Sequence, residues 1–173
     1  MSASILSGIP LNSGVLGVAT SNAYDVRLQQ MSPRGIAAVR ARLPGLHVGA
    51  SFRTYLDQVY AASRGAAIKL DGQNIFVYRN VEGMPDQVDV EFGVGAAQPF
   101  PTEGAVTYCT TPSGSAITTT HWGDYGALRN AHRAVTEWAR EHQVTLAGPR
   151  WEVYGHWRQD ETPRTDIYYL VAP

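Results

Sequence analysis

The sequence predicts an α+β fold in which one β-α-β-β unit occurs twice, related by pseudo-two-fold symmetry. Two aromatic segments, Ile-Phe-Val-Tyr at residues 75–78 and Trp-Glu-Val-Tyr at residues 151–154, match at an offset of about 76 residues. Each half also contains one segment with apolar residues at helical spacing, flanked by segments rich in strand-forming residues. Two such units bury their apolar faces when both helices pack on an antiparallel sheet, and a central ligand groove is expected between the halves.

Each half is expected to begin with a strand, a turn and a second stretch of strand. In the first half these strands are predicted at residues 24–30 and 36–42, separated by a Pro-Arg-Gly turn. In the second half they are predicted at residues 105–110 and 116–120, separated by a Pro-Ser-Gly turn. The matching order supports the duplication.

The following segment of each half predicts an amphipathic helix. In the first half the apolar face runs from Phe52 to Ala62, and Gly65 is expected to end the helix as a left-handed cap. In the second half the face runs from Leu128 to Ala139, after Asp124 as the N-cap residue. Both helices have a polar opposite face and should therefore lie on the surface of the sheet.

Two strands are expected to close each half. They are predicted at residues 74–79 and 88–94 in the first half and at residues 150–157 and 165–171 in the second. The joints between them are polar and contain proline, which indicates loops.

Glu152 breaks the repeat, because it stands where the first half has Phe76. A carboxylate at a buried strand position must be hydrogen-bonded, protonated or paired with a cation. Strand alternation places Glu152 and Tyr154 on one face, with Tyr168 as their expected companion. The face under the helix is expected to carry Trp151, Val153, Ile167, Tyr169 and Val171.

Length and composition predict one domain. The chain has 173 residues and is 44% hydrophobic, which suits one well-buried core rather than two. We expect a domain over residues 23–173, with a first repeat at 23–101 and a second at 102–173. Residues 1–22 are rich in Ser, Gly and Asn, have no counterpart in the second half, and are interpreted as an N-terminal arm.

Charge and residue usage exclude several function classes. The net charge is −1, so direct binding to nucleic acid is not expected. No segment approaches the length of a membrane span, and the single cysteine, Cys109, fits a reducing compartment, so a cytoplasmic protein is expected. The histidines show no metal-site spacing, and the Gly-Val-Gly at residues 93–95 lacks the third glycine of a nucleotide-binding loop, so neither a metal nor a cofactor is expected.

Two motifs resemble the GyrI-like effector-binding family. The first lies at residues 120–125, Thr-His-Trp-Gly-Asp-Tyr, and the second at residues 148–154, Gly-Pro-Arg-Trp-Glu-Val-Tyr. The matching positions are His121, Gly123, Tyr125, Gly148, Pro149, Glu152 and Tyr154. The resemblance implies a duplicated β-α-β-β fold, a central hydrophobic pocket for aromatic and often cationic small molecules, and a ligand-facing role for Glu152.

The first hypothesis is therefore a stand-alone protein that senses or sequesters a hydrophobic aromatic, cationic compound. A second is a hydrolase that opens the cyclopropane of DNA-alkylating natural products, with Glu152 and Tyr125 or Tyr154 positioning the attacking water. A third is a gyrase-inhibitor-like module that binds a protein partner the sequence does not identify.

Strand parity and motif position select the candidate site residues. Besides Glu152, the expected ligand-binding residues are Phe76, Tyr78, Trp122, Tyr125, Tyr154, Trp157 and Tyr168. Trp122, Tyr125 and Trp157 lie at the ends of elements, where they either enclose a ligand or cover a sheet edge. His121 is interpreted as fixing the turn before the second helix rather than as a proton donor.

Overall fold

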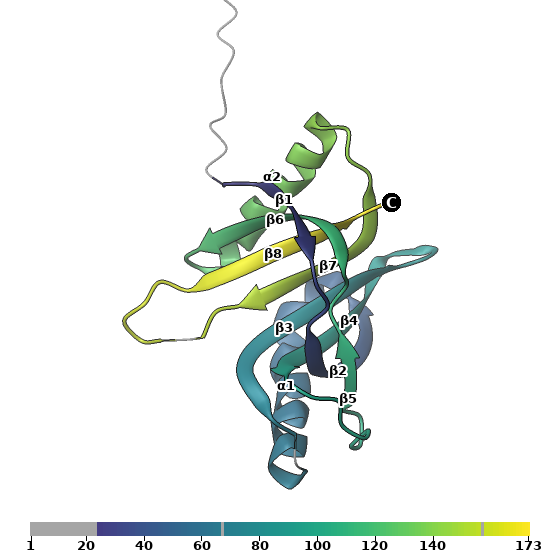
Figure 1. The fold of residues 1–173 in the computed structure, drawn as a ribbon, viewed down its shortest axis with the longest axis vertical. Coiled ribbons are helices and arrows are strands. Elements are labelled where there is room, and N and C mark those ends of the chain that lie inside the picture. Colours follow the sequence, from purple (N-terminus) through teal and green to yellow (C-terminus); the bar gives the residue numbers. More distant parts are fainter. Residues whose placement is uncertain (1–23, 67, 157) are drawn as a thin grey trace, which may run out of the picture.

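The protein folds into one eight-stranded antiparallel sheet that carries two helices, as Figure 1 shows. The computed structural model describes residues 24–66, 68–156 and 158–173. The predicted α+β class is confirmed, whereas the N-terminal arm and Trp157 lie outside the described residues. The strands are β1 (Arg27–Met31), β2 (Gly35–Pro44), β3 (Leu70–Val81), β4 (Met84–Ala96), β5 (Thr107–Thr110), β6 (Gly114–Trp122), β7 (Leu146–Tyr154) and β8 (Arg164–Val171).

The pseudo-two-fold relation of the halves is centred on the β3–β7 pair. The strand order is β1-β6-β8-β7-β3-β4-β2-β5, so β3 and β7 are the two middle strands. Phe76 on β3 lies directly opposite Glu152 on β7. The two residues that the sequence repeat equates are therefore cross-strand neighbours at the middle of the sheet.

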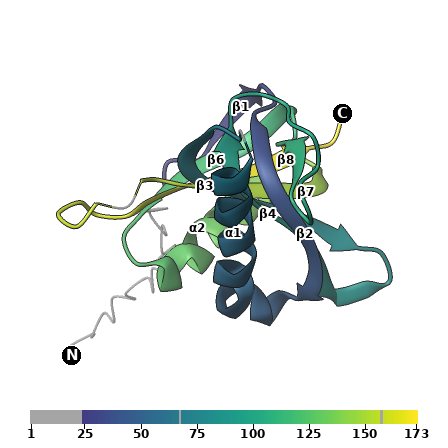
Figure 2. The same ribbon diagram turned by 90° about the horizontal axis from the view of Figure 1, so that it is seen from below.

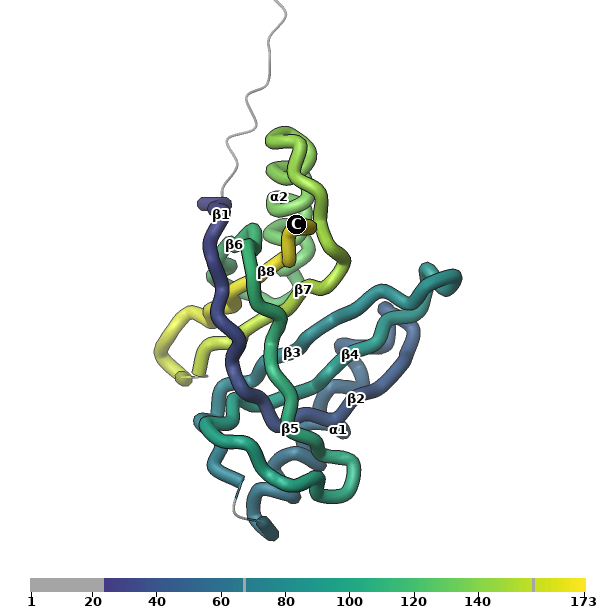
Figure 3. The backbone as a smooth tube through the Cα atoms, turned by 45° about the vertical axis from the view of Figure 1, so that its right-hand side comes forward, coloured from purple at the N-terminus to yellow at the C-terminus, as the bar shows by residue number. Residues whose placement is uncertain are grey.

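The first strands of the two halves cross from one edge of the sheet to the other. β1 pairs with β6 near one end of the sheet, and β2 pairs with β5 at the opposite end. The chain bends between them at Arg34 and Thr111, where Thr111 N–H donates to the Arg34 carbonyl at 2.9 Å and Arg34 N–H donates to Thr111 Oγ1 at 3.0 Å. Figure 3 follows both segments along this path. The predicted order of strand, turn and strand is found in both halves, and the first strand of each half pairs with a strand of the other half.

Both helices lie on the same face of the sheet (Figure 2). α1 (Val48–Gly65) follows a short 3-10 turn, η1 (Gly45–His47), and α2 (Leu128–Glu141) follows another, η2 (Tyr125–Ala127). Asp124 Oδ1 accepts the Gly126 N–H at 2.6 Å, which confirms Asp124 as the N-cap residue, although it caps η2. The left-handed cap expected at Gly65 is wrong: Gly65 is the last helical residue, and Ala66 after it is extended, with φ −121°.

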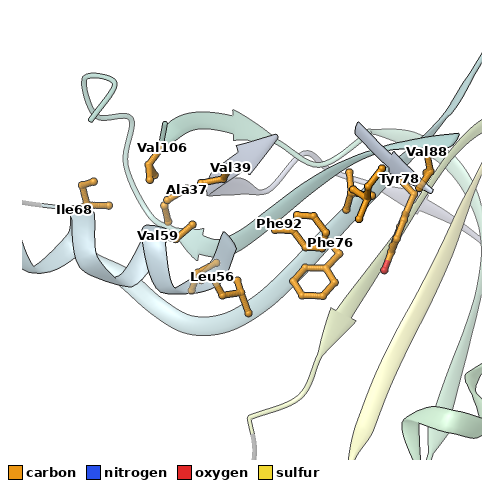
Figure 4. Close-up of a cluster of buried hydrophobic side chains, with 14 residues drawn as sticks. Ala37, Val39, Leu56, Val59, Ile68, Phe76, Tyr78, Val88, Phe92 and Val106 are labelled. Atoms are coloured by element: carbon orange, nitrogen blue, oxygen red, sulfur yellow. The ribbon is translucent and has the colours of Figure 1, made fainter. Parts of the chain in front are cut away.

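The first half has an apolar core between α1 and the sheet. Leu56 and Val59 of α1 pack on strand residues that include Phe76 and Phe92. The rings of Phe76 and Phe92 lie edge to face, with their centroids 5.1 Å apart. In Figure 4 the hydroxyl oxygen of Tyr78 points out of this cluster. Tyr78 therefore contributes its ring to the core and its polar end to the region beyond.

The opposite face of the sheet carries a separate cluster around Trp151, which stacks on Tyr168 at 5.0 Å. The register pairs Trp151 with Tyr168 and Glu152 with Ile167. Directly opposed residues share a face, so Glu152 and Tyr154 face the helices and Tyr168 faces away. The expected companionship of Tyr168 with Glu152 is wrong, because alternation defines two faces but not the register between strands.

Candidate functional site

Glu152 lies at the middle of the sheet as a buried acceptor of three hydrogen bonds. Glu152 is 6% exposed. Tyr78 donates its hydroxyl to Oε2 at 2.8 Å, and Tyr154 donates its hydroxyl to the same oxygen. His132 of α2 donates Nε2–H to Oε1 at 2.7 Å. Both carboxylate oxygens are therefore satisfied by side chains from three different elements.

His132 extends this arrangement by one further group. Its Nδ1 lies 2.9 Å from the Tyr169 hydroxyl. Because an ionised carboxylate only accepts hydrogen bonds, Nε2 must carry a proton, and Nδ1 then accepts from Tyr169 in the neutral ring or donates to it in the charged ring. The result is a continuous chain from Tyr169 through His132 to Glu152, which we call the polar chain.

The polar chain favours the ionised form of Glu152. Burial alone would raise the pKa of Glu152, but the hydrogen bond and charge of His132, with the hydroxyls of Tyr154 and Tyr78, outweigh it and hold this pKa below its usual value. Burial first, and then the nearby charge of Glu152, raise the pKa of both Tyr78 and Tyr154 well above the usual range. At neutral pH the site is therefore a carboxylate held by protonated phenols.

The polar chain replaces apolar residues of the first half. At the repeat offset of about 76 residues, His132 corresponds to Leu56 and Glu152 to Phe76. By strand register Tyr169, which pairs with Arg150, corresponds to Val94, which pairs with Asn74. Sequence reasoning found Glu152 and missed His132 and Tyr169. Applying the offset to the helix would have found His132, since it puts a polar residue at a core position.

A pocket of about 590 Å³ opens above Glu152, between α1 and the start of α2. Of the residues predicted from sequence, the structure brings together Phe76, Tyr78, Tyr125, Tyr154 and Glu152 along its lining. Tyr125 meets the ring of Tyr154 edge to face at 5.8 Å and is 46% exposed, so it lies at the pocket mouth. The first half adds Phe52 and Tyr60, which lie within the apolar stretch of α1 that the sequence predicted.

Two other candidates lie elsewhere. Trp122 is 60% exposed and lines a polar groove on the opposite face of the sheet together with Tyr168, under the guanidinium of Arg164. His121 is buried, with Nε2 donating to the Asp124 carbonyl at 2.9 Å and Nδ1 2.9 Å from the Tyr24 hydroxyl. These contacts fix the turn before α2, as the sequence indicated. Within the described ranges no group of three His, Cys, Asp or Glu side chains could hold a metal ion.

Comparison with known proteins identifies the family of the chain. The family model of the GyrI-like small molecule binding domain matches residues 24–172. The chain belongs to the GyrI-like family. No curated protein sequence matches it. None of the helices in the described part of this GyrI-like chain is long and apolar enough to cross a membrane.

Solved structures with the GyrI-like fold resemble the chain at low sequence identity. The C-terminal domain of EcmrR is 21% identical, with a TM-score of 0.72, over 87% of this chain and 98% of that one. SAV2435 bound to tetraphenylphosphonium is 14% identical, with a TM-score of 0.59, over 86% and 94%. A hydrolase from Listeria innocua is 11% identical, with a TM-score of 0.56, over 85% and 91%. At these identities the likeness establishes the fold alone.

The second GyrI-like motif has a clear local role. Gly148 has φ +106°, a conformation that glycine adopts readily, and it lies within the register shift between Leu146 and Arg150. The shift bends β7 before it reaches the middle of the sheet. The Gly-Pro at residues 148–149 thus lies at the register shift that precedes Glu152.

Proposed function

We propose that this protein binds hydrophobic aromatic cations in the pocket between α1 and α2, with Glu152 as the fixed counter-charge at its floor. The observation that carries the proposal is a buried carboxylate, held by three hydrogen-bond donors, at the base of a pocket walled by aromatic rings. Rings supply apolar area and attract cations through their faces. The carboxylate adds a charge that only a cationic ligand can use.

The hydrogen bonds of Glu152 support binding rather than hydrolysis. A general base works best when its pKa is near the working pH, whereas the pKa of Glu152 is lowered by His132 and the two phenols once these outweigh burial. Three donors also occupy its oxygens, which leaves little capacity to take a proton from water. We therefore favour a binder that holds its ligand without turnover. The ligand of SAV2435, tetraphenylphosphonium, has the chemistry that such a pocket selects.

The test compares two ligands of the same shape and opposite charge, tetraphenylphosphonium and tetraphenylborate, by titration calorimetry. The wild type is expected to bind the cation and to discriminate against the anion. Glu152→Gln keeps the size of the side chain and removes its charge, so binding of the cation should weaken about 10- to 100-fold while binding of the anion does not weaken. Glu161→Gln is the control, because the side chain of Glu161 is 59% exposed and its pair with Arg158 contributes little.

Two outcomes contradict the proposal. Equal binding of both ions by the wild type excludes a counter-charge role for Glu152. A product of changed mass, found after incubation with a strained cyclopropane electrophile and absent with Glu152→Gln, supports the hydrolase instead.

A further inference from the structure

A second pocket, of about 480 Å³, lies beside the aromatic pocket. Val48, Tyr78 and Glu152 line both, so these three side chains form the wall between them. Beyond the wall the lining changes in character: His132 and Tyr169 of the polar chain are joined by Arg129 and Arg150.

Neither arginine has an acidic partner in the described part of the chain. The guanidinium of Arg150 lies over the Tyr78 ring, 4.9 Å from its centroid, and its hydrogen bond to Asn80 Oδ1 is long, at 3.5 Å. Arg129 projects from the first turn of α2 and forms no ion pair with a described carboxylate. By contrast, Arg42 on the other face forms two hydrogen bonds with Asp89, at 2.8 and 2.9 Å.

The acidic residues that line this pocket do not satisfy the arginines. Glu152 accepts three other hydrogen bonds. Asp86 is exposed near the start of β4, where water and salt screen its charge. The positive charge of Arg150 acts on the Tyr169 phenol, because burial raises the pKa of Tyr169 and Arg150 opposes that rise. The arginine donors are therefore available to a ligand.

We propose that this second pocket is an oxyanion subsite, so that the protein prefers zwitterionic aromatic ligands, which carry a carboxylate or phosphonate as well as a cationic ring system. The inference rests on the proposed function, because the aromatic body and its cation occupy the first pocket. A guanidinium binds a carboxylate through two parallel hydrogen bonds, and here Arg150 is held in place by the Tyr78 ring. Glu152, shared by both pockets, lies between the positive and negative ends of such a ligand.

The test uses rhodamine B and its ethyl ester, two dyes with the same cationic ring system that differ in one free carboxylate. Fluorescence anisotropy should show the wild type binding rhodamine B about tenfold more tightly than the ester, the effect of one or two charge-assisted hydrogen bonds. The double variant Arg129→Gln, Arg150→Gln should bind both dyes equally, with affinity for the ester unchanged. Arg129→Lys, Arg150→Lys should recover part of the preference, since the charge remains and the two-pronged geometry is lost.

The control is Arg42→Gln, Arg133→Gln, which also removes two positive charges, at side chains that are 54% and 69% exposed. It should keep the wild-type preference. Equal affinity of the wild type for both dyes, or a parallel loss of both affinities in the double variant, overturns the subsite while leaving the proposed function intact.

Failure of both dyes and of tetraphenylphosphonium to bind counts against the proposed function instead. The subsite is then decided by phenylphosphonate alone, through the NMR signals of the His132 ring. A saturable shift in the wild type that is absent in the double variant supports the subsite. No shift in the wild type overturns it.

Discussion

Replacing His132 by leucine removes the donor that most favours the ionised form of Glu152, and it restores the residue found at the equivalent position of the first half, Leu56. The variant loses a charge-assisted hydrogen bond of 2.7 Å, and Glu152, 6% exposed, cannot regain hydration from solvent. Breaking a buried pair from one side is strongly destabilising, and the 22% exposure of the His132 side chain moderates the loss. We expect a decrease of about 2–4 kcal/mol in the free energy of unfolding.

The contribution of Glu152 to stability should also depend on pH in opposite directions in the wild type and in His132→Leu. In the wild type the folded-state pKa of Glu152 is lowered from 4.5, because His132 and the phenols outweigh burial. Its contribution to stability is therefore fully present above pH 4.5 and is lost as the pH falls through the folded value. Without His132 burial dominates and raises that pKa, so the variant is favoured at low pH and weakens as the pH rises. The difference between the two proteins should be larger at neutral pH than at about pH 4.

Urea unfolding followed by tryptophan fluorescence measures both effects. The control is His47→Leu, the same substitution at an exposed residue outside both pockets. Adding Glu152→Gln to His132→Leu should recover stability, because no unpaired charge then remains. A loss below about 1 kcal/mol, which is the scale of a neutral hydrogen bond, together with an unchanged pH profile, would refute the role assigned to His132.

The remaining predictions concern residues outside the pocket. His121→Ala should lower stability by about 1–3 kcal/mol, since it removes a buried ring together with its hydrogen bonds to Tyr24 and to the Asp124 carbonyl, and should leave the affinity for tetraphenylphosphonium unchanged by calorimetry. Cys109 should react slowly with iodoacetamide at pH 8 and quickly in urea, as followed by mass spectrometry, because burial raises its thiol pKa to about 11. Tyr168→Leu should destabilise the protein by about 1 kcal/mol through loss of its stacking on Trp151, while binding of the same cation stays as in the wild type. Weaker ligand binding by Tyr168→Leu would contradict the position of Tyr168 on the face away from the pocket.

Most helices and strands could be predicted from the sequence repeat, because each element depends on residue spacing within its own segment. The helix stripe from Leu128 to Ala139 and the N-cap at Asp124 depend on spacing along one segment, and both occur. The crossing at Arg34 and Thr111 depends on which half each opening strand pairs with. Nothing in a single strand encodes that choice, so it was not predicted.

Only part of the candidate site could be predicted, because the sequence shows local patterns but not which strands and helices meet. Glu152 is visible in sequence because Phe76 supplies a direct comparison. Tyr168 was placed on the wrong face because register is set by strand pairing and by the shift near Gly148, neither of which alternation reveals. His132 and Tyr169 meet Glu152 from elements that are distant in sequence, and only the folded sheet and helix bring the three together.

The duplication also bears on how such a protein can change during evolution. The three positions filled by Leu56, Phe76 and Val94 in one copy hold that half of the fold together. The other copy fills the same positions with histidine, glutamate and tyrosine. Mutations there alter recognition while an intact apolar copy maintains folding, so the usual conflict between new activity and stability is eased. One copy preserves the architecture, and the other is free to acquire new ligands.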